Sequence, residues 1–387
     1  MWGIYRFKAG PRIVLTIAIL ILFLSTNALS QTAEPDWAKR FDARIEQGIK
    51  DNHIPGLAIG IVFDGRLVYS RGFGEATLGG PKVTPDTLFH MASITKPFVG
   101  TAIMQLVEKG KVSLDDPIVK YVPYFRLNDR RYSSLTIRQF VTHTSGMPDV
   151  DDYEWDKPQY DDAALERYVR SLKNEKLRWE PGSRWAYSNM AFEVLADLIA
   201  KVSGISFEDY VERNILAPTG MVSSTLLFEK TDKKRLASGY TGNEKVLPKP
   251  IKAYPYNRPH NASSDLMSSV NDMARWAMIN LNRGELDGKR ILNDSTYNTM
   301  WNPFAEVEFC RGSQPCQKPG SSVGISWFLQ NKDGQLLVSH SGGDDGFITQ
   351  LVLIPERKFA VVMMMNSDKA GIPFLKQLLS ESLALAK

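Results

Sequence analysis

Extended apolar segments at both ends of the chain, separated by a long middle with helical patterns, most constrain its fold. Near the N-terminus, Asp64-Gly65 joins two such segments as a two-residue hairpin turn. We predict an α+β fold: an antiparallel sheet built from both termini with flanking helices, plus an inserted, mostly helical region. The expected strands are Leu57–Phe63, Leu67–Ser70, Gln335–Ser339, Phe347–Ile354 and Phe359–Met365.

One catalytic domain is expected over residues 31–387, since 387 residues that are 43% hydrophobic can bury a large core. Its α/β part should comprise about 37–110 and 255–387, and its helical part about 111–254. The expected helices include Trp37–Asp51, Ser93–Glu108, Met190–Val202 and Ile372–Ala386, each with apolar residues at helical spacing.

The first 30 residues are typical of a secretory signal peptide. Arg6, Lys8 and Arg12 precede an apolar run of 12 residues, Ile13–Leu24, and Ala28-Leu29-Ser30 offers small residues for cleavage. The run is short for a membrane span, which needs about 20 apolar residues. We expect a secreted or periplasmic protein, membrane-anchored only through an uncleaved leader.

Charge gives no case for a nucleic-acid partner. The net charge is +4, but the three leader cations supply most of it, and no acidic residue falls before position 31. From position 31 onward the chain is therefore close to neutral.

The two cysteines, Cys310 and Cys316, lie close together, which in an exported chain favours one local disulfide. A zinc site is disfavoured because the five histidines are far apart in sequence and no HExxH pattern occurs. We expect neither a metal nor a cofactor.

Ser93-Ile-Thr-Lys96 opens a largely apolar helix. A spacing of three places Lys96 on the same face as Ser93, within reach of its hydroxyl. A serine at a helix N-terminus sits where backbone N–H groups favour developing negative charge. Burial would lower the lysine pKa and let the amine accept a proton. A chance match in which Ser93 only caps the helix is the alternative.

Two further polar motifs follow in the chain. In Tyr187-Ser188-Asn189, Tyr187 could act as a general base and Asn189 could donate to a substrate carbonyl; the alternative is a helix cap beside a packed tyrosine. In His340-Ser341-Gly342-Gly343, paired glycines would let a substrate lie along a strand edge and donate N–H groups to an oxyanion; the alternative is a glycine-rich turn.

Together the three motifs resemble the serine β-lactamase and penicillin-binding-protein superfamily, in its branch of class C β-lactamases, D-aminopeptidases and family VIII esterases, which is peptidase S12-like. The resemblance covers most of residues 40–370. It includes KGKVSLDDPIVKYVP (109–123), LTIRQFVTHTSGMPD (135–149), PGSRWAYSN (181–189) and VGISW (323–327).

The resemblance implies Ser93 as the acylated nucleophile, Lys96 as its proton partner and Tyr187 as the tyrosine of the Y-x-N element. Asn189 would contact substrate. The remaining implied residues are His340, Ser341 and Gly342, which match the K-T-G strand, and Gly343, whose N–H would form the oxyanion hole together with that of Ser93.

His340 stands where that strand usually carries a lysine that helps hold a substrate carboxylate. A histidine is mostly neutral at pH 7, so we expect substrates without a carboxylate rather than substrates that carry one. The segment Asn261–Asp265 also stands where relatives often carry a glycine pair.

The expected activity is a serine hydrolase acting on an ester or amide bond of a small-molecule or peptide-like substrate. The alternatives are a β-lactamase or DD-carboxypeptidase, and, from another class, a non-catalytic cell-wall sensor or binding module.

Two further residues match catalytic patterns but are not expected to be catalytic. Ser322 fits G-x-S-x-G but lacks the helix that a nucleophile elbow requires, and His143 is expected to make structural hydrogen bonds.

Overall fold

The computed structural model describes residues 36–243, 246–308 and 320–385. The predicted leader and both cysteines, Cys310 and Cys316, lie outside these ranges. Within them, no helix combines the length and apolar character that crossing a bilayer demands.

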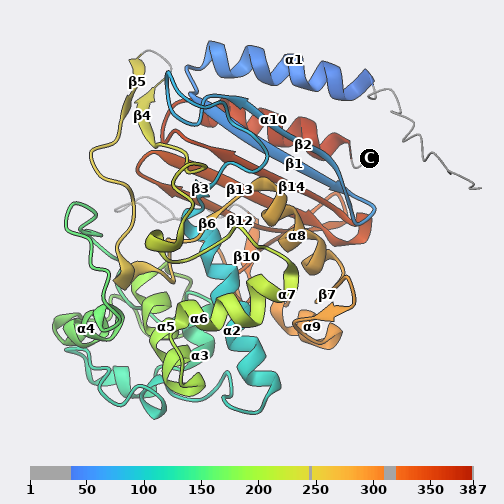
Figure 1. Cartoon of the computed structure of the whole chain (residues 1–387). Coiled ribbons are helices and arrows are strands. Elements are labelled where there is room, and N and C mark those ends of the chain that lie inside the picture. Colours follow the sequence, from blue (N-terminus) through green and yellow to red (C-terminus); the bar gives the residue numbers. More distant parts are fainter. Residues whose placement is uncertain (1–35, 244–245, 309–319, 386–387) are drawn as a thin grey trace, which may run out of the picture.

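The central element is an eight-stranded antiparallel sheet in the order β2-β1-β14-β13-β12-β11-β10-β9 (Figure 1). Its first two strands come from the N-terminal part of the chain and the others from the C-terminal part, so the predicted fold class is confirmed. The strands are β1 (Gly56–Phe63), β2 (Arg66–Gly74), β9 (Ala305–Glu306), β10 (Ser321–Val323), β11 (Phe328–Lys332), β12 (Gln335–Asp344), β13 (Phe347–Ile354) and β14 (Phe359–Met365).

The β1–β2 hairpin turns at Asp64-Gly65, as predicted. Both residues have positive φ, 49° and 70°, the conformation of a type I′ turn that matches the twist of the two strands. β2 continues to Gly74, farther than the sequence indicated.

Strands β1 and β14 are apolar on both faces because helices cover both. On one face, Leu57, Ile59 and Ile61 share a core with helices α1 (Asp36–Asp51) and α10 (Ile372–Ala384). On the other, Ala58 and Val62 belong to the large core that includes helix α8 (Val270–Leu281). This double burial explains the nearly unbroken apolar sequence of these central strands.

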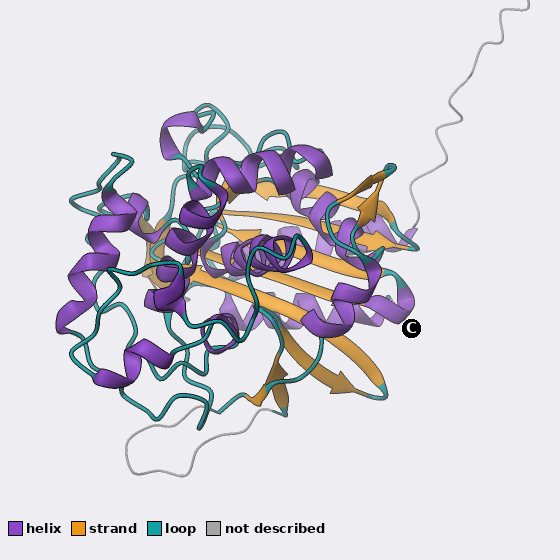
Figure 2. Cartoon of the chain, turned by 90° about the horizontal axis from the view of Figure 1, so that it is seen from below, coloured by secondary structure: helices purple, strands orange, loops and turns teal. Residues whose placement is uncertain are grey.

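The helical region lies below the sheet in Figure 1, and Figure 2 views it from that side. Helix α2 joins it to the sheet region, and Phe98 of α2 stacks on Trp276 of α8 with ring centroids 4.0 Å apart. The helices are α1 (Asp36–Asp51), α2 (Lys96–Glu108), α3 (Ile137–Val141), α4 (Ala164–Ser171), α5 (Asn189–Ser203), α6 (Phe207–Val211), α7 (Ala217–Thr219), α8 (Val270–Leu281), α9 (Asp294–Met300) and α10 (Ile372–Ala384).

Short elements complete the chain. Three two-stranded ribbons pair β3 with β6, β4 with β5 and β7 with β8. Their strands are β3 (Phe89–His90), β4 (Tyr240–Asn243), β5 (Val246–Pro250), β6 (Met267–Ser268), β7 (Glu285–Leu286) and β8 (Lys289–Arg290), and the single turns that bear on the site are η1 (Ala92–Thr95) and η7 (Arg258–His260).

The sequence placed the end of one strand too early. β12 does not stop at Ser339 but runs through the His-Ser-Gly-Gly motif to Asp344, and only Asp345-Gly346 separate it from β13. The extension is stabilised by antiparallel pairing with β13, from Val338↔Leu353 to Asp344↔Phe347.

Candidate active site

Ser93 lies in the 3₁₀ turn η1, and the α-helix begins only at Lys96, which corrects the predicted start of α2. The turn is entered through Ala92, whose φ of 49° lies in the left-handed region that a residue with a Cβ adopts at a cost. The Thr95 hydroxyl donates to the Ala92 carbonyl (2.7 Å) and accepts from the Leu266 N–H (3.1 Å). These contacts hold Ser93 half-buried in a strained turn.

Lys96 is fully buried, and its Nζ atom donates to Ser93 Oγ (3.0 Å) and to the Ser263 carbonyl (2.7 Å). Burial lowers its pKa from 10.5 to about 8, although the carboxylates of Glu193, Asp149 and Asp344 oppose this shift. A substantial fraction of the amine is therefore neutral near pH 8 and able to accept a proton from Ser93.

Tyr187 completes the trio. Its hydroxyl is hydrogen-bonded to the Ser93 side chain, and burial raises its pKa. Its ring stacks on His143 (centroids 4.2 Å apart), and Lys96 Nζ lies 4.9 Å from its centroid. Because its pKa is raised, the phenol of Tyr187 stays protonated at neutral pH, and its hydroxyl is within hydrogen-bond reach of the Ser93 side chain, as a proton relay requires.

Asn189 is the first residue of α5, after the N-cap Ser188. Both its backbone N–H (2.7 Å) and its Nδ2 (2.9 Å) donate to Asp149 Oδ1. Its Oδ1 atom is buried without a hydrogen-bond partner among the described residues. The amide is thus fixed in one orientation by Asp149, which the sequence did not single out although it ends the quoted 135–149 motif.

The His-Ser-Gly-Gly segment forms an edge beside Ser93. Pairing between β11 and β12 stops at Ser339, so the following residues of β12 have β13 on one side only. Gly342 faces the serine turn: a Cβ there would meet the Met91 carbonyl and the Thr349 hydroxyl closer than the 3.0 Å that real Cβ atoms respect. Ser341 and Gly343 alternate with it and are exposed.

His340 points into the interior, where it is 2% exposed. Its Nδ1 atom lies 2.8 Å from the Ser341 carbonyl, and its ring lies 5.1 Å from that of Phe328. Burial and the nearby charge of Lys96 lower its pKa from 6.5 to about 3. His340 is therefore neutral at physiological pH and supplies no cation to the site.

The sequence did not single out Asp149, the Ser263 carbonyl or Glu193, which the structure brings to Lys96 and Asn189. Ser263 lies in the segment noted only because it lacks a glycine pair. A contact made by a backbone carbonyl does not depend on the residue type, and a glutamate that is buried on a helix cannot be told from a surface glutamate in the sequence. A single sequence therefore gives no indication of either contact.

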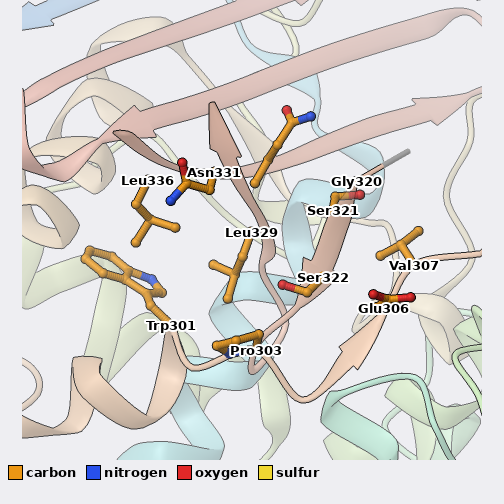
Figure 3. A pocket seen from close by; sticks show the side chains of 11 residues that line it. Trp301, Pro303, Glu306, Val307, Gly320, Ser321, Ser322, Leu329, Asn331 and Leu336 are labelled. Carbon is orange, nitrogen blue, oxygen red and sulfur yellow. The ribbon is translucent and has the colours of Figure 1, made fainter. Parts of the chain in front are cut away.

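Ser322 and His143, which match catalytic patterns in the sequence, occupy structural positions. Ser322 sits within β10, paired with Leu329 and Glu306, and not in a strand-to-helix turn. It lines a hollow of about 460 Å³ by β9–β11 (Figure 3) that neither Ser93, Lys96 nor Tyr187 lines. His143 is buried, accepts a hydrogen bond from the Ser188 N–H at Nδ1 (3.2 Å), and supports the Tyr187 ring.

Among the described residues, no group of three histidine, cysteine, aspartate or glutamate side chains is arranged so that it could bind a metal ion. The chemistry that this arrangement supports is attack by an activated serine beside a strand edge.

The chain resembles known proteins over most of its length. The family model described as Beta-lactamase matches residues 41–378. Protein flp of Staphylococcus aureus (strain MRSA252) is 28% identical over 344 residues, and the unguisins hydrolase ungD' of Aspergillus campestris (strain IBT 28561) is 30% identical over 366 residues. Each match covers 88% of this chain but only 65% of the relative, so the chain spans less than two thirds of the length of these curated relatives.

A solved structure shares the fold. The octameric penicillin-binding protein homologue from Pyrococcus abyssi superposes with a TM-score of 0.76 at 28% identity, covering 90% of this chain and 77% of that one.

Proposed function

Because this chain belongs to the β-lactamase family, whose members are generally serine hydrolases, we propose that it hydrolyses an ester or amide bond through an acyl-enzyme on Ser93. One observation carries the proposal: a buried lysine with a lowered pKa lies 3.0 Å from a half-buried serine hydroxyl. That arrangement is a nucleophile with its own base.

In the first step, Ser93 Oγ bonds to the substrate carbonyl carbon while its proton passes to Lys96 Nζ. The carbonyl oxygen becomes an oxyanion, which the backbone N–H groups of Ser93 and Gly343 stabilise. The bond to the leaving alcohol or amine then breaks, and the Tyr187 hydroxyl passes it the proton held by Lys96.

In the second step, water attacks the acyl-serine ester. The proton of the water moves through the Tyr187–Lys96 pair to Ser93 Oγ as that oxygen leaves, which releases the carboxylic acid and restores the resting enzyme. No cofactor enters either step.

The electrostatics of the site favour substrates without a carboxylate. The histidine in place of the strand lysine is neutral, and the carboxylates that act on Lys96 are Glu193, Asp149 and Asp344. A substrate carboxylate would meet negative charge without a fixed cation from this strand. Esters and amides lacking that group are therefore preferred over β-lactams and terminal D-Ala peptides, and a relative named as an unguisins hydrolase supports hydrolysis as the reaction class.

The decisive experiment is intact mass spectrometry of wild type, Ser93→Ala and Ser322→Ala after treatment with a fluorophosphonate and, separately, with a penicillin. A stoichiometric fluorophosphonate adduct in wild type and Ser322→Ala, absent in Ser93→Ala, is expected. A stable penicillin adduct on Ser93 would instead favour the penicillin-binding-protein alternative. Failure of both reagents would make a non-catalytic wall sensor or binding module the leading function.

For localisation we propose export by a leader comprising residues 1–30. N-terminal sequencing of the protein from periplasmic and culture fractions should give a chain beginning near residue 31. A full-length chain in the membrane fraction would show that the leader is kept as an anchor.

A further inference from the structure

Glu193 is a buried carboxylate that the proposed reaction does not use. It lies one turn after Asn189 on α5 and is completely inaccessible to solvent. Neither of its oxygens accepts a hydrogen bond from any described residue. Burying polar oxygens without hydrogen-bond partners is costly, so this side chain calls for an explanation.

The group that faces this carboxylate is His260, whose Nδ1 atom lies 3.5 Å from Glu193 Oε1. His260 is itself buried, with the rings of Tyr153 and Tyr168 edge-on to it at 4.8 Å each. The two side chains therefore form an enclosed pair with aromatic walls.

The pair is connected to the catalytic lysine through the backbone. His260 ends the turn η7, and the Ser263 N–H donates to its carbonyl (3.1 Å). The Ser263 carbonyl in turn accepts from Lys96 Nζ (2.7 Å). The turn that carries His260 therefore also delivers one of the two hydrogen-bond partners of the lysine.

Charge provides a second connection. Among the carboxylates that raise the pKa of Lys96 against burial, Glu193 acts most strongly, ahead of Asp149 and Asp344. The other titratable groups that act on the lysine and its partners come from the neighbouring loops and strands. Around Lys96 they are His143, Tyr187 and His340, and around Glu193 they are Tyr153, Tyr168, His260 and Asp265.

We propose that Glu193, held against His260, is a positioning residue that sets the pH at which Lys96 can take the proton of Ser93. Burial lowers the pKa of Lys96, and the interaction with Glu193 opposes this shift. The inference rests on the proposed acylation of Ser93 and adds to it the control of the base.

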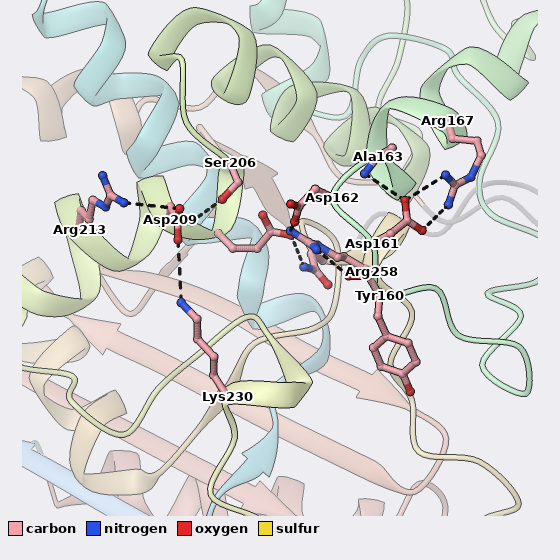
Figure 4. A network of polar contacts seen from close by, with 12 residues as sticks. Tyr160, Asp161, Asp162, Ala163, Arg167, Ser206, Asp209, Arg213, Lys230 and Arg258 are labelled. Carbon is pink, nitrogen blue, oxygen red and sulfur yellow. Dashed lines mark hydrogen bonds and ion pairs between the residues drawn. The ribbon is translucent and has the colours of Figure 1, made fainter.

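A matched control is Glu208 of α6, which contacts the same turn η7. Glu208 is also buried, and its Oε1 accepts from Arg258 Nε (2.9 Å) and Asn261 Nδ2 (2.7 Å). Figure 4 shows how Arg258 ties this turn to the segment carrying Tyr160 and Asp162. Glu208 is not among the charges that act on Lys96. We therefore expect removal of the Glu208 charge to affect the contacts of η7 and not the charges that act on Lys96.

The experiment measures the second-order rate of fluorophosphonate labelling between pH 5.5 and 10 for wild type, Glu193→Gln, Glu193→Met, Glu193→Asp and Glu208→Gln. Without the carboxylate charge, the acidic limb of the pH–rate profile should move to lower pH by about half to one unit in the Gln and Met variants. Labelling near pH 6.5, relative to the plateau rate at high pH, should then be about 3–10-fold faster than in wild type. Glu193→Asp keeps the charge and should keep the limb of wild type. Glu208→Gln should also keep the limb, whatever its plateau rate.

An unshifted limb in both charge-removing variants would overturn the inference, as would an equal shift in Glu208→Gln. Folding is followed by circular dichroism. Loss of fold in both Glu193→Gln and Glu193→Met would also overturn it, because Glu193 would then be a structural residue. If wild-type Ser93 is unlabelled at every pH, the proposed function itself fails, and this outcome is distinct from labelling with an unshifted limb.

Discussion

Lys96 Nζ lies 3.0 Å from Ser93 Oγ across the junction between a 3₁₀ turn and an α-helix. The same nitrogen is bound to a carbonyl 167 residues farther along the chain, that of Ser263. The nucleophile and its base are therefore neighbours in sequence, but the orientation of the base depends on a distant segment.

Replacing Lys96 with alanine should reduce hydrolysis of an activated aryl ester by about a thousandfold or more, because Ser93 loses the amine that accepts its proton in the proposed reaction and the two residues act as a unit. In wild type, kcat/KM should rise with pH through about 8, since the neutral amine is the reactive form and predominates above its pKa. Stopped-flow or plate assays across pH 6–10 measure both effects. A Lys96→Ala variant within tenfold of wild type would remove Lys96 from the mechanism.

Tyr187→Phe removes the hydroxyl that bonds Ser93 but keeps the ring that stacks on His143. Turnover should fall about 100-fold or more, in the range of a lost general acid–base group, while the melting temperature changes little. Ester kinetics and thermal unfolding are measured side by side. Unchanged turnover would show that the hydroxyl carries no proton in the reaction.

Gly342→Ala should both destabilise the protein and reduce activity, because the new Cβ would collide with the Met91 carbonyl next to the serine turn. We expect a loss of about 2–3 kcal/mol in the free energy of unfolding, as for overpacked cores. Urea unfolding provides the measurement, with Gly343→Ala as comparison: its Cβ would approach only Ile348, at 3.2 Å, and should cost about 1 kcal/mol or less. Equal losses in the two variants would contradict the close approach at Gly342.

Asp149→Ala should lower kcat/KM by about 10-fold or more, because Asn189 loses the carboxylate that fixes its backbone and side-chain amides. The control is Asp151→Ala, two residues away and 93% exposed, which should stay close to wild type. The measurement is kcat/KM of both variants and wild type with the same ester. If both variants behave alike, Asn189 does not depend on Asp149.

His340→Asn should flatten the dependence of stability on pH. In the folded protein the pKa of His340 is lowered to about 3, whereas in the unfolded chain it is near 6.5. Between these values the unfolded state binds more protons, so stability falls as pH decreases from 6.5 toward 3, by roughly 3 kcal/mol at pH 4 from this group. Urea unfolding at pH 7 and pH 4 should show a smaller difference in the variant, and an undiminished difference would mean that His340 is not the buried neutral base.

Local patterns of the sequence predicted much of the fold and the central pair of the site. Residues close along the chain decide their geometry together: the Asp64-Gly65 turn sets the β1–β2 hairpin, and the spacing of three brings Lys96 to Ser93. The apolar runs at both ends predicted the shared sheet because only double-sided burial suits them.

Other features depended on contacts between distant segments. β12 extends through a glycine pair because β13 supplies its hydrogen bonds, although the glycines alone favour a turn. Likewise, nothing local to Ala92 predicts its left-handed backbone, which is stabilised by packing around the serine turn.

The sequence by itself determined the family and the sheet built from both termini, and it predicted Ser93, Lys96 and Tyr187 as the catalytic residues, because these follow from short-range spacing and recurring motifs. Only the tertiary structure decided the lowered pKa of Lys96, the neutrality of His340 and the placement of Asp149, Ser263 and Glu193 around the site. The physical reason is that burial and electrostatic fields arise from groups that the folded chain brings together across many residues, and neither quantity is a property of any one segment.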